Sequence, residues 1–230
     1  MKLSIIVPVF NEEKTVAEII QRLVTVTLPP SCEREIIVVN DASTDQTGQV
    51  LQNISVPIVI LKHSHNQGKG AAVISGLQRA TGDVVVVQDA DLEYDPSDFV
   101  SLLVPILAGQ ADVVFGSRFL GQRTRWVGSF WHRLFNQSLT TISNFFTNLT
   151  LSDMETCYKM FTRQVVDEIK DKLVSRRFGI EPEITARVKK YRLYEVPISY
   201  NGRRVAEGKK ITWRDGVAAV WHIIRFNLWT

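Results

Sequence analysis

The sequence predicts an α/β protein in which helices flank a mostly parallel central sheet. Apolar runs of strand length alternate with stretches of helical periodicity over residues 1–116, and the connections between them are short. The run Val84–Val87 consists of four consecutive valines, which suit a strand that is buried on both faces. Repeated strand–helix–strand units of this kind build a parallel, right-handed, doubly wound sheet.

The first half of the chain contains five expected strands with helices between them. The strands are expected at residues 3–9, 35–40, 57–61, 84–87 and 112–116. Val16, Ile19, Ile20 and Leu23 repeat at helical spacing, and Asn11 is expected to cap the helix that they form. Two further helices are expected at residues 71–80 and 97–107.

The second half is expected to be mainly helical. The pattern predicts an aromatic-rich helix at residues 129–149, a helix that begins at 179–183, a strand at 193–200, a basic loop at 201–210 and an amphipathic helix at 212–229. Pro182 stands at a first-turn position, where proline is tolerated. Since we find no linker, repeat or low-complexity segment, we expect a single domain over residues 1–230.

Composition excludes several classes of protein. The 230 residues are 45% hydrophobic and 22% charged, as in an ordinary globular protein, and a net charge of +3 does not indicate nucleic-acid binding. Cys32 and Cys157 lie far apart without a metal-ligand pattern, so a reduced, cytoplasmic setting is expected. No window reaches the roughly 20 uncharged apolar residues that a bilayer-spanning helix needs, so none is expected.

Carboxylates follow the valine strand directly. Asp89 and Asp91 are two residues apart, so in extended chain both side chains lie on one face, and Glu93 continues that face. Hard oxygen ligands of this kind suit Mg²⁺ or Mn²⁺. The alternative is a polar loop in which Asp91 or Asp95 starts the next helix.

Other polar groups fall at the same edge of the expected sheet. Glu12 follows the first strand and Asp41 follows the second, and ligands of open α/β sheets bind at the carboxyl ends of strands. Asp41 can accept a hydrogen bond from a nucleobase, whereas Gly68 and Lys69 suit a phosphate. Alternatively, Glu12 and Asp41 could be helix caps, and Gly68 and Lys69 could belong to a helix N-terminus that needs small residues. A dinucleotide-binding glycine motif and a Walker loop are both absent.

Several motifs together resemble family 2 of the GT-A glycosyltransferases, and specifically its dolichol-phosphate mannosyltransferase-like branch. The motifs that resemble the family are Ile6-Val7-Pro8-Val9-Phe10-Asn11-Glu12, Val39-Asn40-Asp41-Ala42-Ser43-Thr44-Asp45, Asn66-Gln67-Gly68-Lys69-Gly70 and Gln88-Asp89-Ala90-Asp91-Leu92-Glu93. The motifs that resemble the branch are Asp153-Met154-Glu155-Thr156-Cys157-Tyr158-Lys159, Ile180-Glu181-Pro182-Glu183 and Val196-Pro197-Ile198-Ser199-Tyr200. The resemblance covers nearly the whole chain, and the motifs stand in the family's order.

The resemblance implies a GT-A nucleotide-sugar-binding fold and inverting transfer of a hexose from GDP-mannose or UDP-glucose to a polyprenyl phosphate. Residues 1–116 would be the nucleotide-sugar-binding half and residues 117–230 the acceptor-binding half. The residues implied around the donor are Pro8, Val9, Asn11, Glu12, Asp41, Gly68 and Lys69. Asp89, Asp91 and Glu93 would hold Mg²⁺ or Mn²⁺, and Arg118 and Arg203 would bind the acceptor phosphate.

Asp153 and Glu155 are open to three roles. Either can act as a general base if the acceptor is a hydroxyl. With a phosphate acceptor, which is already an anion near neutral pH, they are expected to orient the acceptor or a loop instead. In the third role they cap the turn before Cys157 and Tyr158.

The sequence departs from the family pattern in three places. Many bacterial relatives carry two C-terminal transmembrane helices, and these 230 residues contain none. Glu93 stands where some relatives have Gln. Residues 122–126 match a Gln-x-x-Arg-Trp signature of processive synthases, but they precede Asp153 instead of following it, so we interpret them as a basic loop.

The acceptor stays open between a lipid and a soluble molecule. The aromatic residues of 126–146, near Arg123, Arg125 and Arg133, can dock on the cytoplasmic membrane face, or they can be plain core. A separate membrane partner protein could also bring a lipid acceptor to the site. Two remoter hypotheses are a sugar-1-phosphate nucleotidyltransferase, which would need a Gly-rich loop after the first strand, and a non-catalytic nucleotide-sugar binding module.

Overall fold

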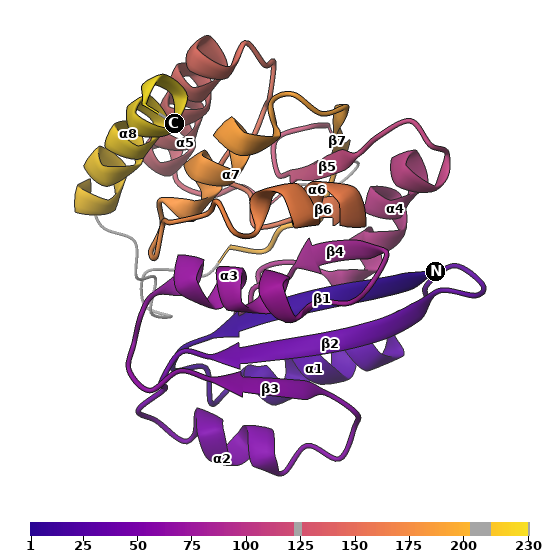
Figure 1. The fold of residues 1–230 in the computed structure, drawn as a ribbon. Helices are drawn as coiled ribbons and strands as arrows, with labels where there is room; N and C mark the ends of the chain where they lie inside the picture. The colour runs from indigo at the N-terminus through magenta and orange to yellow at the C-terminus, as the bar shows by residue number, and fades with distance from the viewer. Residues whose placement is uncertain (122–125, 203–212, 230) are drawn as a thin grey trace.

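The structure is a computed structural model that describes every residue except 122–125, 203–212 and 230 (Figure 1). A seven-stranded sheet in the order β3-β2-β1-β4-β6-β5-β7 runs through the molecule. Its strands are β1 (Lys2–Val9), β2 (Glu33–Asn40), β3 (Val59–Lys62), β4 (Val84–Val87), β5 (Val113–Ser117), β6 (Lys159–Thr162) and β7 (Leu193–Pro197).

Eight α-helices surround the sheet in the described part of the chain. They are α1 (Val16–Thr25), α2 (Thr47–Gln52), α3 (Lys69–Arg79), α4 (Phe99–Leu107), α5 (Phe130–Thr147), α6 (Arg163–Ile169), α7 (Ile180–Val188) and α8 (Trp213–Leu228), and a short 3-10 helix, η1 (Pro96–Asp98), precedes α4. Helix α3 packs on β1 and β2, and α4 packs on β5, β6 and β7. Helices α5, α7 and α8 pack against one another at the upper left of Figure 1.

The core follows the apolar runs of the sequence. All four valines of β4 are buried, and so are the apolar residues of β1 that pair with them. Val16, Ile19, Ile20 and Leu23 form the buried face of α1, as their spacing predicts. The expected α/β class and the mostly parallel sheet are confirmed, because β1–β4, β5 and β7 run in one direction.

The sequence pattern does not predict strand β6 and helix α6. β6 is antiparallel to both β4 and β5 and lies between them, so these consecutive strands are not neighbours. The pattern gives no clear signal because β6 has four residues and begins with Lys159, which is 2% exposed. With a charged residue at its start, so short a segment does not show the apolar pattern by which a buried strand is predicted.

The predicted capping role of Asn11 is wrong. Helix α1 begins at Val16, and Thr15 occupies the N-cap position. Asn11 has a φ of 55°, in the left-handed region where asparagine is enriched, and its Oδ1 accepts a hydrogen bond from the Thr44 N–H at 2.8 Å. It therefore ties the loop after β1 to the loop after β2.

Candidate active site

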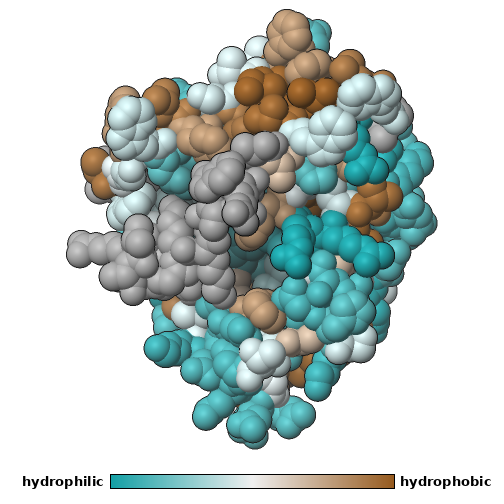
Figure 2. Space-filling model, turned by 90° about the vertical axis from the view of Figure 1, so that its left-hand side faces the viewer, coloured by the Kyte–Doolittle hydropathy of each residue, from teal (hydrophilic) through white to brown (hydrophobic). Residues whose placement is uncertain are grey.

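The carboxyl ends of the parallel strands meet at one edge of the sheet. The last residues of β1 and β2, Val9 and Asn40, are paired, and Val87 at the end of β4 pairs with Ile6 of β1. Figure 2 views the molecule from the side toward which the β1 and β2 arrows point in Figure 1, and this face has a hollow near its centre. Most of the residues singled out from the sequence lie along this edge.

Lys69 lies between two carboxylates. Its Nζ is 2.9 Å from Asp89 Oδ1 and 3.1 Å from Glu181 Oε1. Burial by itself lowers the pKa of Lys69, but the charges of Asp89 and Glu181 outweigh burial and hold the pKa well above its ordinary value. Lys69 is therefore an ammonium ion at the end of β4. The sequence motif around Glu181 points to the family, but nothing in it identifies Glu181 as the partner of Lys69.

Gly68 and Gly70, on either side of Lys69, allow close approach of another backbone segment. Gly68 has a φ of 96°, and a Cβ added there would lie 2.4 Å from the carbonyl oxygen of Arg176. A Cβ on Gly70 would lie 2.1 Å from the carbonyl oxygen of Ser175. The two glycines thus permit packing against residues 175–176, and this packing fixes where α3 begins.

The chain makes a tight turn after Asp89. Asp91 Oδ1 accepts a hydrogen bond from the Glu93 N–H at 3.1 Å, and Leu92 between them has a φ of 64°. Glu93 Oε2 accepts the hydroxyl hydrogen of Tyr200 at 2.6 Å. Glu93 is thereby linked to the segment that follows β7.

The carboxylates at this edge have the chemistry for a divalent cation. No group of three His, Cys, Asp or Glu side chains that could hold a metal ion occurs among the described residues. Magnesium, however, is commonly held by one or two carboxylates while waters and substrate phosphates complete its coordination. Asp89 and Asp91 supply two such carboxylates, although Asp89 is paired with Lys69 and Asp91 Oδ1 accepts from the Glu93 N–H. Glu93 is engaged by Tyr200.

Asp41 is almost fully buried, with 2% of its surface exposed. Its Oδ1 accepts a hydrogen bond from the Gln67 N–H at 2.9 Å and lies 2.7 Å from His63 Nδ1, and its Oδ2 accepts from the Gly68 N–H at 2.7 Å. A carboxylate has about four acceptor positions, and the contacts with described residues leave one of them on Oδ2.

Glu12 joins the loop after β1 to the start of α2. Its N–H donates to the Thr47 hydroxyl oxygen at 2.9 Å, and its Oε2 accepts from the Thr15 hydroxyl at 2.7 Å. The backbone of Glu12 is therefore held at the same edge as Asn11, while its carboxylate also contacts the residue that precedes α1.

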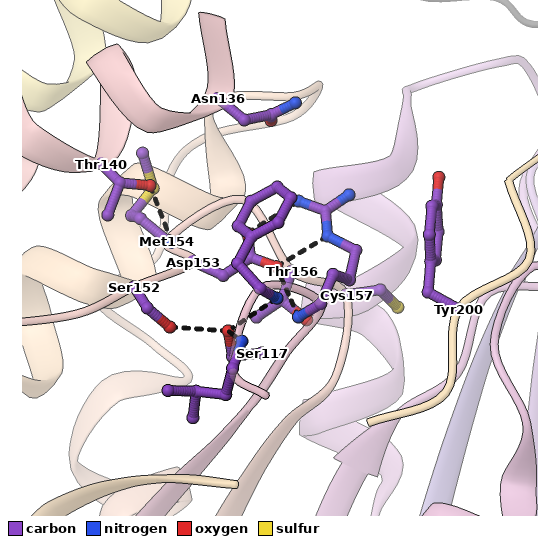
Figure 3. A network of polar contacts seen from close by, with 12 residues as sticks. Ser117, Asn136, Thr140, Ser152, Asp153, Met154, Thr156, Cys157 and Tyr200 are labelled. Atoms are coloured by element: carbon purple, nitrogen blue, oxygen red, sulfur yellow. Dashed lines mark hydrogen bonds and ion pairs between the residues drawn. The ribbon is translucent and has the colours of Figure 1, made fainter. Parts of the chain in front are cut away.

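Arg118 forms a two-pronged ion pair with Asp153. The Nε and Nη2 atoms of Arg118 each lie 2.7 Å from a carboxylate oxygen of Asp153, which is fully buried. The guanidinium carbon is 5.3 Å from the centre of the Tyr200 ring. Figure 3 shows Asp153 in the middle of this network, with Ser117 and Ser152 on one side and Tyr200 on the other.

Glu155 and Lys159 lie in the same buried region. Burial and the Glu181 charge raise the pKa of Glu155 to about 7, and burial lowers the pKa of Lys159. Within the described structure, three buried polar atoms near this position have no hydrogen-bond partner: Glu155 Oε1, Thr156 Oγ1 and Glu181 Oε2. Buried polar atoms without a partner are costly, so each of these three calls for an explanation such as a bound water or ion.

The structure therefore joins several of the predicted residues, and others lie outside the part of the chain that it describes. Asp89 meets Lys69, Arg118 meets Asp153, and Glu93 meets Tyr200. Pro8 and Val9 complete β1 at the same edge. Arg203, the other predicted ligand of the acceptor phosphate, lies outside the described residues, as do Arg123 and Arg125.

Comparison with known proteins identifies relatives. The family model described as Glycosyl transferase family 2 matches residues 4–170. A dolichol-phosphate mannosyltransferase from Pyrococcus furiosus is 27% identical over 100% of this chain and 64% of its own length. An uncharacterized glycosyltransferase from Synechocystis is 32% identical over 77% of this chain and 55% of its own length. The chain thus spans less than two thirds of each of these relatives.

Solved structures confirm the fold. Glucosyl-3-phosphoglycerate synthase from Mycobacterium tuberculosis, crystallised with Mn²⁺, UDP-glucose and phosphoglyceric acid, superposes with a TM-score of 0.72 at 16% identity, over 98% of this chain and 79% of that one. TarS 1–349 from S. aureus gives a TM-score of 0.63 at 19% identity, over 98% of this chain and 71% of that one. The predicted GT-A fold is confirmed by these likenesses.

Proposed function

Because the chain belongs to glycosyl transferase family 2, we propose that it moves a hexose from a nucleotide sugar, GDP-mannose or UDP-glucose, to a polyprenyl phosphate with inversion. One observation carries the proposal. The Tyr200 ring lies 5.3 Å from the guanidinium carbon of Arg118, and the Tyr200 hydroxyl donates to Glu93 at 2.6 Å. An arginine suited to a phosphate is thereby close to the segment that carries Asp89 and Asp91.

The donor is proposed to lie along the ends of β1, β2 and β4. Pro8, Val9, Asn11 and Glu12 follow or end β1, and Asp41 retains one acceptor position for a nucleobase N–H. Gly68 and Lys69 are proposed to face the diphosphate. Lys69 suits this role because the ion pairs with Asp89 and Glu181 keep its side chain protonated and hold it in place.

Asp89 and Asp91 are proposed to hold Mg²⁺ or Mn²⁺ with the diphosphate oxygens, and Glu93 would join them only after releasing Tyr200. The bound cation would supply Lewis-acid stabilisation of the departing nucleoside diphosphate. A crystallised protein of the same fold contains Mn²⁺ and UDP-glucose, which supports this assignment.

The acceptor phosphate is proposed to meet Arg118. Asp153 holds Nε and Nη2 of Arg118, and no described residue bonds Nη1, which leaves that edge of the guanidinium to a phosphate oxygen. Asp153 thus serves as the residue that orients Arg118. Because a phosphate acceptor is already an anion, this mechanism depends on positioning and needs no general base.

A hydroxyl acceptor is the second candidate, and one observation favours it. The pKa of Glu155 is raised to about 7, which suits a general base, and its Oε1 is buried without a described partner. A soluble acceptor hydroxyl next to Glu155 would lose its proton there as the glycosidic bond forms. Asp153 is less suited to this role because Arg118 occupies both of its oxygens.

Contact with a membrane is proposed through helices α5 and α8. Large apolar side chains on them are exposed: Phe130, Trp131, Leu134, Phe135, Phe145, Trp221 and Leu228, with Trp229 directly after α8. Figure 2 shows hydrophobic side chains across the top of the molecule and a hydrophilic lower half. No helix in the described residues is long and apolar enough to cross a bilayer. Docking on the cytoplasmic face, or on a membrane partner protein, would bring a lipid acceptor to Arg118.

A two-step experiment tests the proposal. Thermal shift with UDP-glucose, GDP-mannose, Mg²⁺ and Mn²⁺ should reveal one stabilising donor–metal pair, since specific binding raises the melting temperature by mass action. That donor is then offered with polyprenyl phosphate and, separately, with hydroxyl acceptors. Transfer to the phosphate supports the proposal, transfer to hydroxyls alone favours the second candidate, and donor binding without any transfer would mean a non-catalytic binding module.

A further inference from the structure

We infer that His63 is a positioning residue for nucleotide binding, acting through Asp41 on the turn that precedes Lys69. Its placement follows from the sheet. Lys62, the last residue of β3, pairs with Asn40 at the end of β2, and the His63 N–H donates to the Asn40 carbonyl oxygen at 3.0 Å. His63 and Asp41 are therefore the first residues beyond two paired strand ends.

The imidazole is held at both nitrogens. Nδ1 lies 2.7 Å from Asp41 Oδ1, and Nε2 lies 3.0 Å from the hydroxyl oxygen of Ser75, which belongs to α3. An ionised carboxylate can only accept hydrogen bonds, so Nδ1 carries a hydrogen. In the neutral ring, Nε2 then accepts from the Ser75 hydroxyl. The side chain of His63 is only 10% exposed, which keeps competing water away.

Asp41 connects His63 to the turn at Gln67 and Gly68. Its two oxygens accept the N–H groups of Gln67 and Gly68 at 2.9 and 2.7 Å. Gly68 is the N-cap residue of α3, and Lys69 is the first residue of that helix. The position of the Lys69 Cα, and hence the direction of its ammonium toward Asp89, depends on where Asp41 holds these two N–H groups.

His63 fixes Asp41 against rotation. If the Gln67 and Gly68 N–H groups were its only partners, the Asp41 carboxylate could tilt together with the turn. Both N–H groups belong to that turn, so neither fixes the carboxylate relative to the rest of the sheet. The third bond comes from outside that segment, from a ring anchored on β2 by its backbone and on α3 by Ser75. Supporting partners of this kind orient a functional group without touching the ligand.

The inference rests on the proposed function, because it concerns binding of a nucleoside diphosphate at this edge. Three variants separate positioning from packing. His63→Asn puts an amide N–H where Nδ1 stands, whereas His63→Gln puts the same amide where Nε2 stands. His63→Leu fills the space without any hydrogen bond.

Two readouts are measured on the full chain: amide hydrogen exchange at Gln67 and Gly68, and affinity for UDP and GDP in the presence of Mn²⁺. Losing the Asp41 contact should cost about tenfold in affinity. We expect His63→Leu and His63→Gln to show that loss and faster exchange at both amides, while His63→Asn stays close to the wild type.

Two results would overturn the inference, and a third would count against the proposed function on which it rests. A packing role predicts that His63→Leu retains affinity and His63→Asn loses it, which is the reverse order. Unchanged exchange at Gln67 and Gly68 in all three variants would also exclude positioning. If His63→Leu does not fold, the comparison of Asn with Gln still decides. A wild type that binds neither UDP nor GDP would count against the proposed function, whereas the exchange measurement would still test His63.

Discussion

At the scale of single residues, Asp91 offers the most direct test of the proposed cation site. Asp91→Asn should weaken nucleoside-diphosphate binding in Mn²⁺ by roughly 10- to 100-fold or more, because even the loss of an outer partner of a metal site has an effect of that size. Asp41→Asn should weaken donor binding whether or not metal is present. Isothermal titration with UDP and GDP, with Mn²⁺ or with EDTA, separates the two effects.

Asp95→Asn is the matched control. Asp95 is exposed and accepts from the Ser97 N–H at 2.9 Å as the cap of η1, so its loss should cost about 1 kcal/mol of stability or less without changing affinity. Full activity of the wild type in EDTA would remove the cation from the mechanism, and full activity of Asp91→Asn in Mn²⁺ would remove Asp91 from the proposed cation site.

Arg118 pairs with Asp153, and we propose that it also binds the acceptor phosphate. Lysine keeps the charge but cannot reproduce the fork to Asp153 and reach a phosphate at the same time. Arg118→Lys should therefore retain donor binding and lose about ten- to a hundredfold in transfer to polyprenyl phosphate. Donor affinity and transfer rate are measured separately, in detergent.

Arg133→Lys is the control for Arg118. The guanidinium carbon of Arg133 lies 5.5 Å from the centre of the Phe119 ring, the same distance at which Arg118 contacts that ring, and no bond from it to Asp153 is present in the described structure. This change should leave transfer to the phosphate as it is in the wild type. Equal transfer by wild type and Arg118→Lys would contradict the phosphate role and favour the hydroxyl acceptor.

At the scale of secondary-structure elements, the contact between α3 and residues 175–176 depends on glycine. Gly70→Ala would place a Cβ 2.1 Å from the Ser175 carbonyl oxygen, so backbone must move, and we expect a loss of about 1–3 kcal/mol in the free energy of unfolding. Lys69 would move with it, so nucleotide affinity should fall too. Urea unfolding and titration with UDP or GDP measure the two effects.

Gly48→Ala in α2 is the matched helix control. Its Cβ would meet its nearest atom, Nδ2 of Asn40, at an ordinary 3.7 Å. Alanine is favoured over glycine in helices by about 1 kcal/mol, so this change should be neutral or stabilising. Equal effects at the two positions would mean that α3 is not held by close backbone approach.

Glu35 joins β1, β2 and the turn before β4 in a pH-dependent way. It accepts from Lys2 Nζ and the Thr81 N–H, each at 2.9 Å, and from the Ser4 hydroxyl. Burial alone raises the pKa of Glu35, but these hydrogen bonds outweigh it and lower the pKa from 4.5 to about 2. The stabilisation is therefore complete above pH 4.5 and is lost as the pH falls toward 2.

Glu35→Gln should lower the free energy of unfolding at pH 7, and its difference from the wild type should shrink below pH 4.5. Urea unfolding at neutral pH and at several values below 4.5 measures this dependence. Glu18→Gln, which breaks an exposed pair with Arg22, should have almost no effect at any pH. A difference that is constant with pH would show that Glu35 acts through shape and not through charge.

At the scale of the whole molecule, the exposed aromatic face of α5 and α8 tests the lipid acceptor. Trp131 and Phe145 are 74% and 82% exposed. Replacing both with serine should reduce binding to anionic liposomes by about tenfold or more, because each buried aromatic contributes roughly 1.5–3 kcal/mol. Liposome flotation, with and without polyprenyl phosphate, measures the loss.

Val104 and Leu107 on α4 provide the control, since they are 57% and 52% exposed on a helix at the other side of Figure 1. Serine at both should leave flotation unchanged. A wild type that does not bind anionic vesicles at all would favour a soluble acceptor or a separate membrane partner. The short apolar stripe on α4 would become the membrane candidate if only its variants lost binding.

Local sequence is enough to predict most of the elements and the edge at which the site lies. Runs such as Val84–Val87 and the helical spacing of Val16, Ile19 and Ile20 report burial directly, because they reflect periods of two or 3.6 residues within one element. Asp89, Asp91 and Asp41 can be placed at strand ends for the same local reason. The motifs and their order are enough to recognise the family.

Which side chains meet is settled only in the folded chain. Arg118 and Asp153 are 35 residues apart, His63 and Asp41 are 22 apart, and Lys69 reaches Glu181 from a different helix. Insertion of β6 between β4 and β5 brings the segment of Asp153 and Glu155 to the site. No local period encodes such pairings, because they depend on strand order and on how distant segments close on one another, and both are properties of the tertiary structure.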